Sequence, residues 1–218
     1  MNVEVDHKAM TARAKEAEFF ETPEWAVESI LKVETMTSCV IDPCAGRGAL
    51  GKAAREAHHI VHEYDLNIWP DQQPDHRIIA PFDYLAPLGD VRTVVNGALG
   101  GGEFTVLMNP PFSKTIEFVE RSMRLGARKI VMFQRLAFLE SAGRRGFFER
   151  SMPARVWICG DRATCWRGDI PEEDIEAPDG EIIQGRKGRS ASTPHAWFIW
   201  ERGHRGAGSI NHLYKTTK

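Results

Sequence analysis

Short apolar runs recur along the chain, and segments with helical periodicity separate most of them. Runs of this length that are rich in β-branched residues are typical of buried strands in α/β sheets. We predict strands at residues 38–42, 60–65, 77–80, 104–108, 129–134, 154–159 and 196–201. The last of these contains Trp197-Phe198-Ile199-Trp200, so both of its faces are expected to be buried.

Helix signals lie between the predicted strands. We predict a short polar helix at residues 8–18, and a second helix that Thr22 caps and in which Pro23 takes the first position. Small residues after the first strand predict a helix that ends near Ala57. Residues 86–103 have no clear assignment.

Two further helices are predicted in the second half of the chain. Ser113 is expected to cap the first of them. Its apolar positions share one face and are Ile116, Val119 and Met123. The second helix contains Arg144, Arg145, Phe147 and Phe148.

The sequence Asn109-Pro110-Pro111-Phe112 directly follows the predicted strand 104–108. Ligands of open α/β sheets bind at the carboxyl ends of the strands. The two prolines remove backbone donors and fix φ, so the carbonyl groups of Asn109 and Pro110 are free to accept hydrogen bonds. An exocyclic amine would donate its N–H groups to the Asn109 side-chain oxygen and the Pro110 carbonyl, while Phe112 offers a flat face to a planar base. An ordinary strand-to-loop turn is the alternative interpretation.

A glycine-rich turn follows the first strand and opens a helix. Its sequence is Asp42-Pro43-Cys44-Ala45-Gly46-Arg47-Gly48. Glycine lets a ligand approach the backbone closely, and the helix N–H groups face that ligand. Asp65 ends the next strand, where an acid accepts bonds from both hydroxyls of a ribose. Asp83 would accept from an adenine amino group, and a surface turn residue is its alternative interpretation.

The net charge of −2 is unevenly distributed over the 218 residues. Residues 1–120 carry 10 basic and 19 acidic side chains, whereas residues 121–218 carry 18 basic and 11 acidic ones. An acidic protein with this distribution can still present a basic face. The sequence has no apolar segment of bilayer-spanning length and no signal-peptide pattern at its start, so a cytoplasmic location is expected.

Cysteine and histidine spacing gives little evidence of a metal. The four cysteines, Cys39, Cys44, Cys159 and Cys165, form no C-x-x-C pair, so free thiols are expected. His58, His59 and His62 lack the H-E-x-x-H pattern and are expected at a solvated helix end, with a metal site as the alternative. We predict no metal.

Residues 160–195 form a long insertion between the last two predicted strands. Such a length without regular structure is typical of a functional or disordered segment. Its first half is acidic, and its second half carries the basic residues Arg186, Lys187 and Arg189. Since no composition shift marks a linker, we predict a single domain over residues 1–218, with an N-terminal helical segment at 1–37.

Two other enzyme classes share parts of these patterns. Gly46-Arg47-Gly48-Ala49-Leu50-Gly51 matches G-x-G-x-x-G, and Asp65 follows at a spacing typical of nicotinamide-dependent dehydrogenases. The dinucleotide fingerprint contains neither an Asp-Pro before the first glycine nor an Asn-Pro-Pro-Phe. Pro43-Cys44 is a candidate nucleophile of a cytosine C5-methyltransferase, but that cysteine is expected after the fourth strand, where this chain has Asn-Pro-Pro-Phe.

Taken together, the motifs resemble those of S-adenosylmethionine-dependent DNA adenine N6-methyltransferases, in particular compact bacteriophage-type members. Residues 42–48 resemble motif I, Asp65 the ribose acid, Asp83 the adenine acid and residues 109–112 motif IV. Phe20-Glu21-Thr22-Pro23 resembles motif X. The resemblance extends over residues 135–140 and 196–200 and covers most of the chain, although it includes no separate target-recognition domain.

This resemblance implies a Rossmann-like methyltransferase fold, with a seven-stranded, mostly parallel sheet, an antiparallel last strand and helices on both faces. It implies S-adenosylmethionine as the donor, DNA as the acceptor, and direct in-line transfer to the N6 amine of adenine. Related families act on RNA or on protein glutamine, and a non-catalytic cofactor-binding or nucleic-acid-binding module is a further alternative. The expected catalytic residues are Asn109, Pro110, Pro111 and Phe112. The expected cofactor-binding residues are Phe20, Thr22, Pro23, Asp42, Pro43, Cys44, Ala45, Gly46, Gly48, Asp65, Asp83, Tyr84 and Asn109. The expected nucleic-acid contacts are Arg186, Lys187, Arg189, Arg144 and Arg145.

Overall fold

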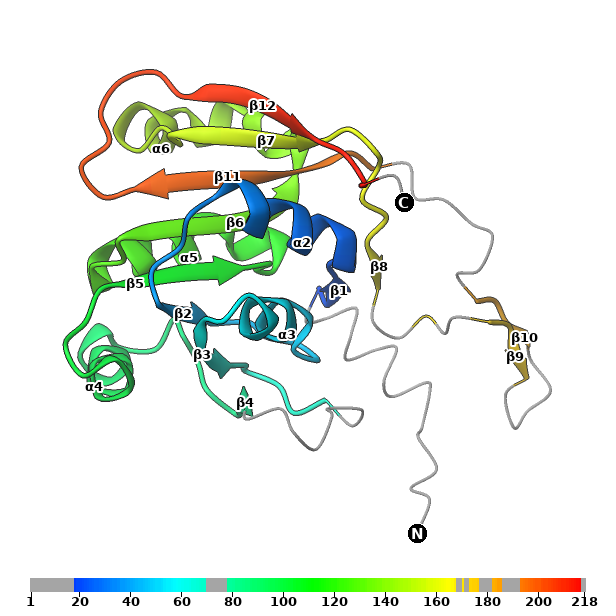
Figure 1. The fold of residues 1–218 in the computed structure, drawn as a ribbon, viewed down its shortest axis with the longest axis horizontal. Helices are drawn as coiled ribbons and strands as arrows, with labels where there is room; N and C mark the ends of the chain where they lie inside the picture. The colour runs from blue at the N-terminus through cyan, green and yellow to red at the C-terminus, as the bar shows by residue number, and fades with distance from the viewer. Residues whose placement is uncertain are drawn as a thin grey trace, which may run out of the picture.

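An eight-stranded sheet forms the centre of the molecule (Figure 1). The computed structural model describes residues 18–69, 78–167, 170, 173–176, 182–185 and 193–216. Within these ranges the strand order is β12-β7-β11-β6-β5-β2-β3-β4. The strands are β2 (Cys39–Asp42), β3 (Ile60–Tyr64), β4 (Ile78–Ile79), β5 (Phe104–Met108), β6 (Lys129–Arg135), β7 (Arg155–Cys159), β11 (His195–Glu201) and β12 (Ser209–Leu213).

The directions of the strands confirm the predicted fold class and correct the number of strands. Strands β4, β3, β2, β5 and β6 are mutually parallel. Strand β11 runs antiparallel to both β6 and β7, as predicted. The predicted seven strands are all present, but β12 adds an eighth that pairs in parallel with β7 at the edge of the sheet. This edge strand was missed because four of its five residues are at least partly exposed, which leaves almost no apolar pattern.

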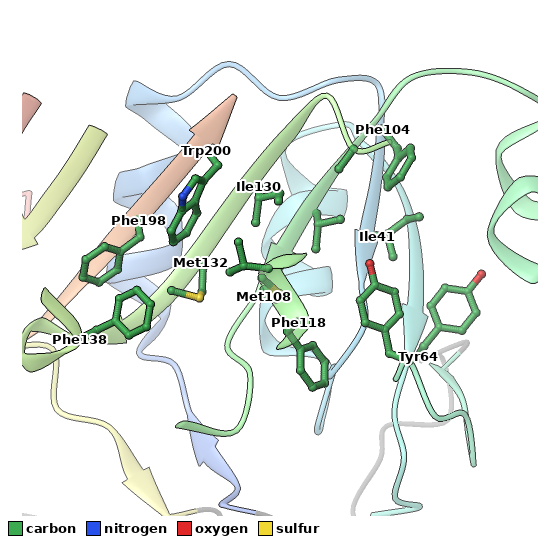
Figure 2. Close-up of a cluster of buried hydrophobic side chains, with 14 of the residues drawn as sticks. Ile41, Tyr64, Phe104, Met108, Phe118, Ile130, Met132, Phe138, Phe198 and Trp200 are labelled. Carbon is green, nitrogen blue, oxygen red and sulfur yellow. The ribbon is translucent and has the colours of Figure 1, made fainter. Parts of the chain in front are cut away.

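Helices cover both faces of the sheet. On one face lie α2 (Glu24–Val33) and α3 (Ala49–Glu56). On the other lie α4 (Leu88–Leu99), α5 (Thr115–Leu125) and α6 (Arg145–Arg150). Figure 2 shows this second core, where Met108, Met132 and Phe198 from neighbouring strands lie among Phe118 and Phe138. Because both faces are covered, β5 is buried at all five positions, as its mostly apolar sequence predicts.

Several helix predictions need correction. Residues 88–99, left unassigned from sequence, form α4. Thr22 does not cap α2, because its side chain contacts Asn109 and Pro23 occupies the N-cap position. The helix after Ser113 begins at Thr115, following a 3-10 turn at Phe112–Lys114. Its Met123 is exposed and its buried face is formed by Thr115, Phe118, Val119 and Ser122. The predicted helix at residues 8–18 falls almost entirely outside the described residues.

The insertion at 160–195 has some regular structure where it is described. Strand β8 (Trp166–Arg167) pairs antiparallel with β1 (Phe20–Glu21). Strands β9 (Ile175–Glu176) and β10 (Ile182–Ile183) pair with each other. The prediction of a segment without regular structure was therefore wrong in part. The pairing of β1 with β8 fixes the segment that precedes α2.

A cluster of ion pairs lies where β6 begins and β11 ends, at the edge of the sheet opposite the glycine-rich turn. Arg155 and Lys129 both contact Glu34, with Lys129 Nζ 2.8 Å from its carboxylate. Burial raises the pKa of Glu34, but hydrogen bonds from Arg155, Lys129 and Trp157 outweigh it, so the pKa lies below its usual value. Glu201 contacts the same two cations. These pairs anchor the end of α2 to the sheet.

No helix in the described part of the chain is long and apolar enough to cross a membrane.

Candidate active site

A cavity of about 260 Å³ lies at the carboxyl ends of β2 and its neighbours β3 and β5. Its wall brings together three segments that are far apart in sequence: the stretch before α2, the glycine-rich turn after β2 and the Asn-Pro-Pro-Phe loop after β5. Among its lining residues are Phe20, Thr22, Cys44, Asp65, Asp83 and Asn109. Motifs separated in the sequence therefore meet at one edge of the sheet, as the open α/β topology requires.

The glycine-rich turn depends on backbone conformations that other residues rarely adopt. Gly46 has φ of 58° and Gly48, at the N-cap of α3, has φ of 87°. The ring of Phe19 lies directly against Gly46, and a Cβ at this position would be 2.5 Å from Phe19 Cε2. Phe19 also stacks on Trp69 with 4.3 Å between ring centroids. An aromatic pair thus covers the turn from the cavity side.

Asp65 lies directly after β3 and is buried. Its Oδ2 accepts a hydrogen bond of 2.8 Å from the Gly46 N–H, and its Oδ1 accepts one of 2.7 Å from the Asn67 N–H. Burial raises the pKa of Asp65, and these backbone donors partly oppose the increase. The carboxylate therefore shapes the glycine turn in addition to lining the cavity.

Asp42 lies beneath the turn and is fully buried. Its Oδ1 accepts a hydrogen bond of 3.1 Å from the Cys44 N–H, whereas Oδ2 has no hydrogen-bond partner in the described residues. Burial, together with the charge of neighbouring Glu63, raises its pKa well above the usual value. Burial likewise raises the pKa of the Cys44 thiol, so Cys44 at the cavity wall is a neutral thiol and a poor nucleophile. Pro43 and Ala45 complete this part of the wall.

Asp83 and Tyr84 also line the cavity. Asp83 is exposed, and its Oδ1 accepts a hydrogen bond of 2.8 Å from the Leu85 N–H. Tyr84 is buried, and its hydroxyl pairs with Ser122 Oγ at 3.1 Å. Burial raises the pKa of Tyr84, so the phenol remains protonated. The second oxygen of Asp83 stays available for a ligand at the cavity mouth.

The side chain of Asn109 has a defined orientation. Its Nδ2 donates to the Phe20 carbonyl at 2.7 Å and to Thr22 Oγ1 at 3.0 Å. Both amide hydrogens are thereby used, so Oδ1 is left as the acceptor for a ligand. Among the described residues no N–H donates to the Pro110 carbonyl, whereas the Pro111 carbonyl accepts from Lys114. Two oxygen acceptors therefore follow β5 in adjacent residues.

Phe112 belongs to a small aromatic group beside this loop. Its ring stacks on Phe20 with 5.3 Å between centroids and an interplanar angle of 18°. The guanidinium of Arg135 lies 4.3 Å from the centroid of Phe112 and 5.8 Å from that of Phe20. His195 is buried beside them, 6.4 Å from Phe112. Phe20 therefore covers part of the Phe112 ring surface that was predicted to stack on a base.

The predicted nucleic-acid residues have different surroundings. Arg144 lies over Phe138 and donates to the carbonyl groups of Ala137 and Phe138. Arg145 is highly exposed and pairs with Glu149 at 2.7 Å. Arg186, Lys187 and Arg189 lie outside the described residues.

The predicted histidine cluster shows no site for a metal in the part of the chain that is described. His59 Nδ1 lies 2.9 Å from the Thr37 carbonyl, a contact that holds the loop before β2.

Three residues of this region were not singled out from the sequence as site residues: Phe19, Trp69 and Arg135. Phe19 directly precedes the Phe20-Glu21-Thr22-Pro23 segment, and Trp69 is separated from any recognised motif. Arg135 carried a detectable signal, since a cation ends the strand next to the one that precedes Asn109. Its proximity to Phe112 depends on ring orientation, which the sequence does not encode locally.

Comparisons with known proteins give a fold but no family. No protein-family profile matches the sequence, and no curated protein matches it. The methyltransferase subunit of a type I restriction-modification system from Streptococcus thermophilus aligns with a TM-score of 0.52 and 13% identity, over 97% of this chain and 53% of that one. This chain thus spans about half the length of that subunit.

Two further solved structures are similar at lower scores. A predicted O-methyltransferase from Agrobacterium tumefaciens has a TM-score of 0.48 and 15% identity, over 88% of this chain and 84% of that one. A TehB-like SAM-dependent methyltransferase from Corynebacterium glutamicum has a TM-score of 0.45 and 10% identity, over 89% and 97%. The strand order and the Streptococcus structure together establish the Rossmann-like α/β fold of methyltransferases.

Proposed function

We propose that this chain transfers a methyl group from S-adenosylmethionine to the exocyclic N6 amine of adenine in DNA, with S-adenosylhomocysteine as the second product. The observation that carries the proposal is the orientation of Asn109. Its amide N–H groups are bonded to Phe20 and Thr22, so its oxygen is left as an acceptor next to the Pro110 carbonyl. Two adjacent acceptors match an amine with two N–H donors.

The cavity has groups that suit the proposed donor. Asp65 and Asp83 are acceptors for ribose hydroxyls and an adenine amine, and Phe82 offers an apolar surface in the same wall. The turn around Gly46 brings backbone close to the cavity, and Asn109 lies in the same wall. The groups proposed to bind the cofactor and the amide proposed to bind the acceptor line the same cavity, which supports the proposal.

The chemistry follows from where these groups lie. The donor supplies a sulfonium methyl group that is electrophilic without further activation. The target nitrogen attacks that methyl in line, a C–N bond forms as the C–S bond breaks, and the electron pair of the broken bond remains on sulfur. Asn109 Oδ1 and the Pro110 carbonyl accept the amine N–H groups and so direct its lone pair toward the methyl. The methylated nitrogen then loses one proton to solvent.

The choice of DNA rests on the motif resemblance and on the fold shared with a restriction-modification methyltransferase subunit. Adenine in RNA and the side-chain amide of protein glutamine present the same pair of N–H donors. A module that binds the donor without turnover would retain the cavity, but it would have no need of an amide oriented by two hydrogen bonds.

The decisive experiment separates these acceptors. The protein is incubated with labelled donor and, separately, with unmodified DNA, RNA and lysate protein, and the digested products are identified by mass spectrometry. N6-methyladenine in DNA alone supports the proposal, whereas methylglutamine or methylated RNA contradicts the assignment to DNA. Asn109→Ala should lower turnover by about 10²-fold or more, as expected for loss of a preorganised polar group. Turnover of this variant at the wild-type rate would refute the role of Asn109.

A further inference from the structure

An exposed arginine lies beside the proposed acceptor site, and none of the described residues gives it an acidic partner. Arg135 ends β6 and is exposed. No carboxylate in the described ranges pairs with its guanidinium, in contrast with Arg47 at the same cavity, which pairs with Glu21 at 2.9 Å. Arg135 contacts aromatic rings instead, at 4.3 Å from the centroid of Phe112 and 5.8 Å from that of Phe20.

The three distances place the guanidinium beside the aromatic pair. Phe20 and Phe112 are 5.3 Å apart, so the two rings and Arg135 form a triangle of similar sides. A guanidinium that contacts ring faces keeps its in-plane N–H donors free for an anion. The packing therefore holds the cation in place without neutralising it.

The topology places this cation next to Asn109. Strands β5 and β6 are parallel neighbours, with Met108 opposite Met132. Asn109 follows the last residue of β5 and Arg135 is the last residue of β6, so both lie at the carboxyl edge of adjacent strands. Phe112 bridges them, since it belongs to the Asn109 loop and touches Arg135.

The strand that packs against Arg135 from the other side places no negative charge opposite it. Strand β11 pairs with β6 so that His195 lies opposite Arg135. The imidazole is buried and stacks on Phe133 at 5.1 Å. An anion at Arg135 would therefore meet no carboxylate from the neighbouring strand.

We propose that Arg135 binds a backbone phosphate of the nucleotide whose base enters the site, and that the acceptor is therefore a nucleic-acid strand rather than a glutamine side chain. This inference rests on the proposed methyl transfer at Asn109. In a nucleotide the phosphate and the base are joined through one sugar, whereas a glutamine side chain has no anion in that position. The planar guanidinium, which binds a phosphate through paired N–H groups, is suited to this contact.

The test compares DNA binding of the whole protein across a series of salt concentrations. Fluorescence anisotropy is measured with a labelled duplex of mixed sequence for wild type, Arg135→Ala and Arg135→Lys. The matched control is Arg124→Ala, which removes an exposed arginine that pairs with Glu120 near the end of α5, where the chain turns toward the start of β6. Thermal unfolding of each variant establishes that it is folded.

Loss of one phosphate contact should lower the magnitude of the log-affinity versus log-salt slope by about 0.9 in Arg135→Ala. Affinity at low salt should fall by about tenfold or more, as for a lost charge-assisted hydrogen bond. Arg135→Lys retains the charge and should keep a slope near wild type with intermediate affinity. Arg124→Ala should match wild type in both quantities.

Equal slopes for Arg135→Ala and Arg124→Ala would overturn the inference. A loss of affinity for S-adenosylmethionine with an unchanged DNA slope would also overturn it, because Arg135 would then bind the donor's carboxylate. Wild-type methylation of DNA with no slope change refutes only the phosphate contact. A changed slope without any methylation of DNA by wild type retains the contact and refutes the proposed reaction.

Discussion

The orientation of Asn109 by two acceptors predicts a measurable effect of replacing Thr22 with valine. Thr22 is 5% exposed, and its Oγ1 accepts one of the two Asn109 hydrogen bonds at 3.0 Å. Valine has nearly the same shape but no acceptor. The Thr22→Val variant therefore removes one bond and leaves the packing of the cavity wall almost unchanged.

The size of the effect follows from what remains. The Phe20 carbonyl still accepts from Nδ2 at 2.7 Å, and a reversed amide would set Oδ1 against that carbonyl. The amide thus keeps its orientation with less restraint, at a cost of about 1 kcal/mol for one neutral hydrogen bond. If this cost falls on the transition state, kcat decreases about fivefold. Donor affinity should change little.

The assay is single-turnover methyl transfer, together with calorimetric titration of the donor. Thr22→Ser is the control, because serine keeps the hydroxyl of Thr22 and lacks only its buried methyl group. We expect Thr22→Ser to be less stable than wild type but to keep the wild-type rate. We expect Thr22→Val to have a lower rate than wild type. Equal rates for Thr22→Val and wild type, or equal impairment of both variants, would show that Thr22 does not orient Asn109.

Three further predictions follow. Asp65→Ala should weaken S-adenosylmethionine binding by about 1.5–3 kcal/mol, because charge-assisted bonds to the ribose are lost and the Gly46 N–H loses the Asp65 carboxylate. Calorimetry on the wild type that finds tight NADH binding and no binding of the methyl donor would refute this site. Burial and the charge of Arg135 lower the pKa of His195 from 6.5 to about 4, so the folded state binds fewer protons than the unfolded state between these values. The stability that a neutral His195 contributes is complete above pH 6.5 and falls as the pH drops toward 4. Urea unfolding should therefore show that wild type loses stability relative to His195→Phe on acidification. A stability difference between the two that does not change with pH would contradict this prediction. Alanine at Arg186, Lys187 and Arg189 together should reduce the salt slope of DNA binding by about 0.9 for each lost phosphate contact, whereas an unchanged slope would redirect the search to other basic residues.

Local pattern was sufficient to predict the part of the site that follows strand ends. Strand β5 is apolar at every position except Thr105 and is buried throughout, so its sequence pattern was enough to place Asn109 at the carboxyl edge. The glycine turn could also be predicted from the sequence, because Gly46 and Gly48 adopt positive φ angles that few other residues tolerate. Asp65 was expected as a ligand acceptor, and the structure adds that it binds the turn itself.

Features that depend on long-range contacts could not be predicted in this way. Thr22 has the local signature of a helix cap, but Asn109 competes for its hydroxyl from 87 residues away. Helix α4 contains glycine at positions 89 and 97, which obscures its periodicity, and only Val91 and Val95 are buried. Arg135 gains its setting from the rings of Phe20 and Phe112, which the sequence separates widely.

The hydrogen bond between Asn109 and the Phe20 carbonyl has a consequence for how the protein reaches its active form. It joins groups 89 residues apart, and the strand that carries Phe20 is itself held by β8 near residue 167. Pairings of such large sequence separation require closure of long loops and form slowly. Recovery of activity after refolding should therefore be slower than recovery of the helical and sheet signals. A nascent chain that has not yet been extended through β8 already contains its Asn-Pro-Pro-Phe loop. It still lacks the β1–β8 pairing that holds Phe20 in place to orient the Asn109 amide.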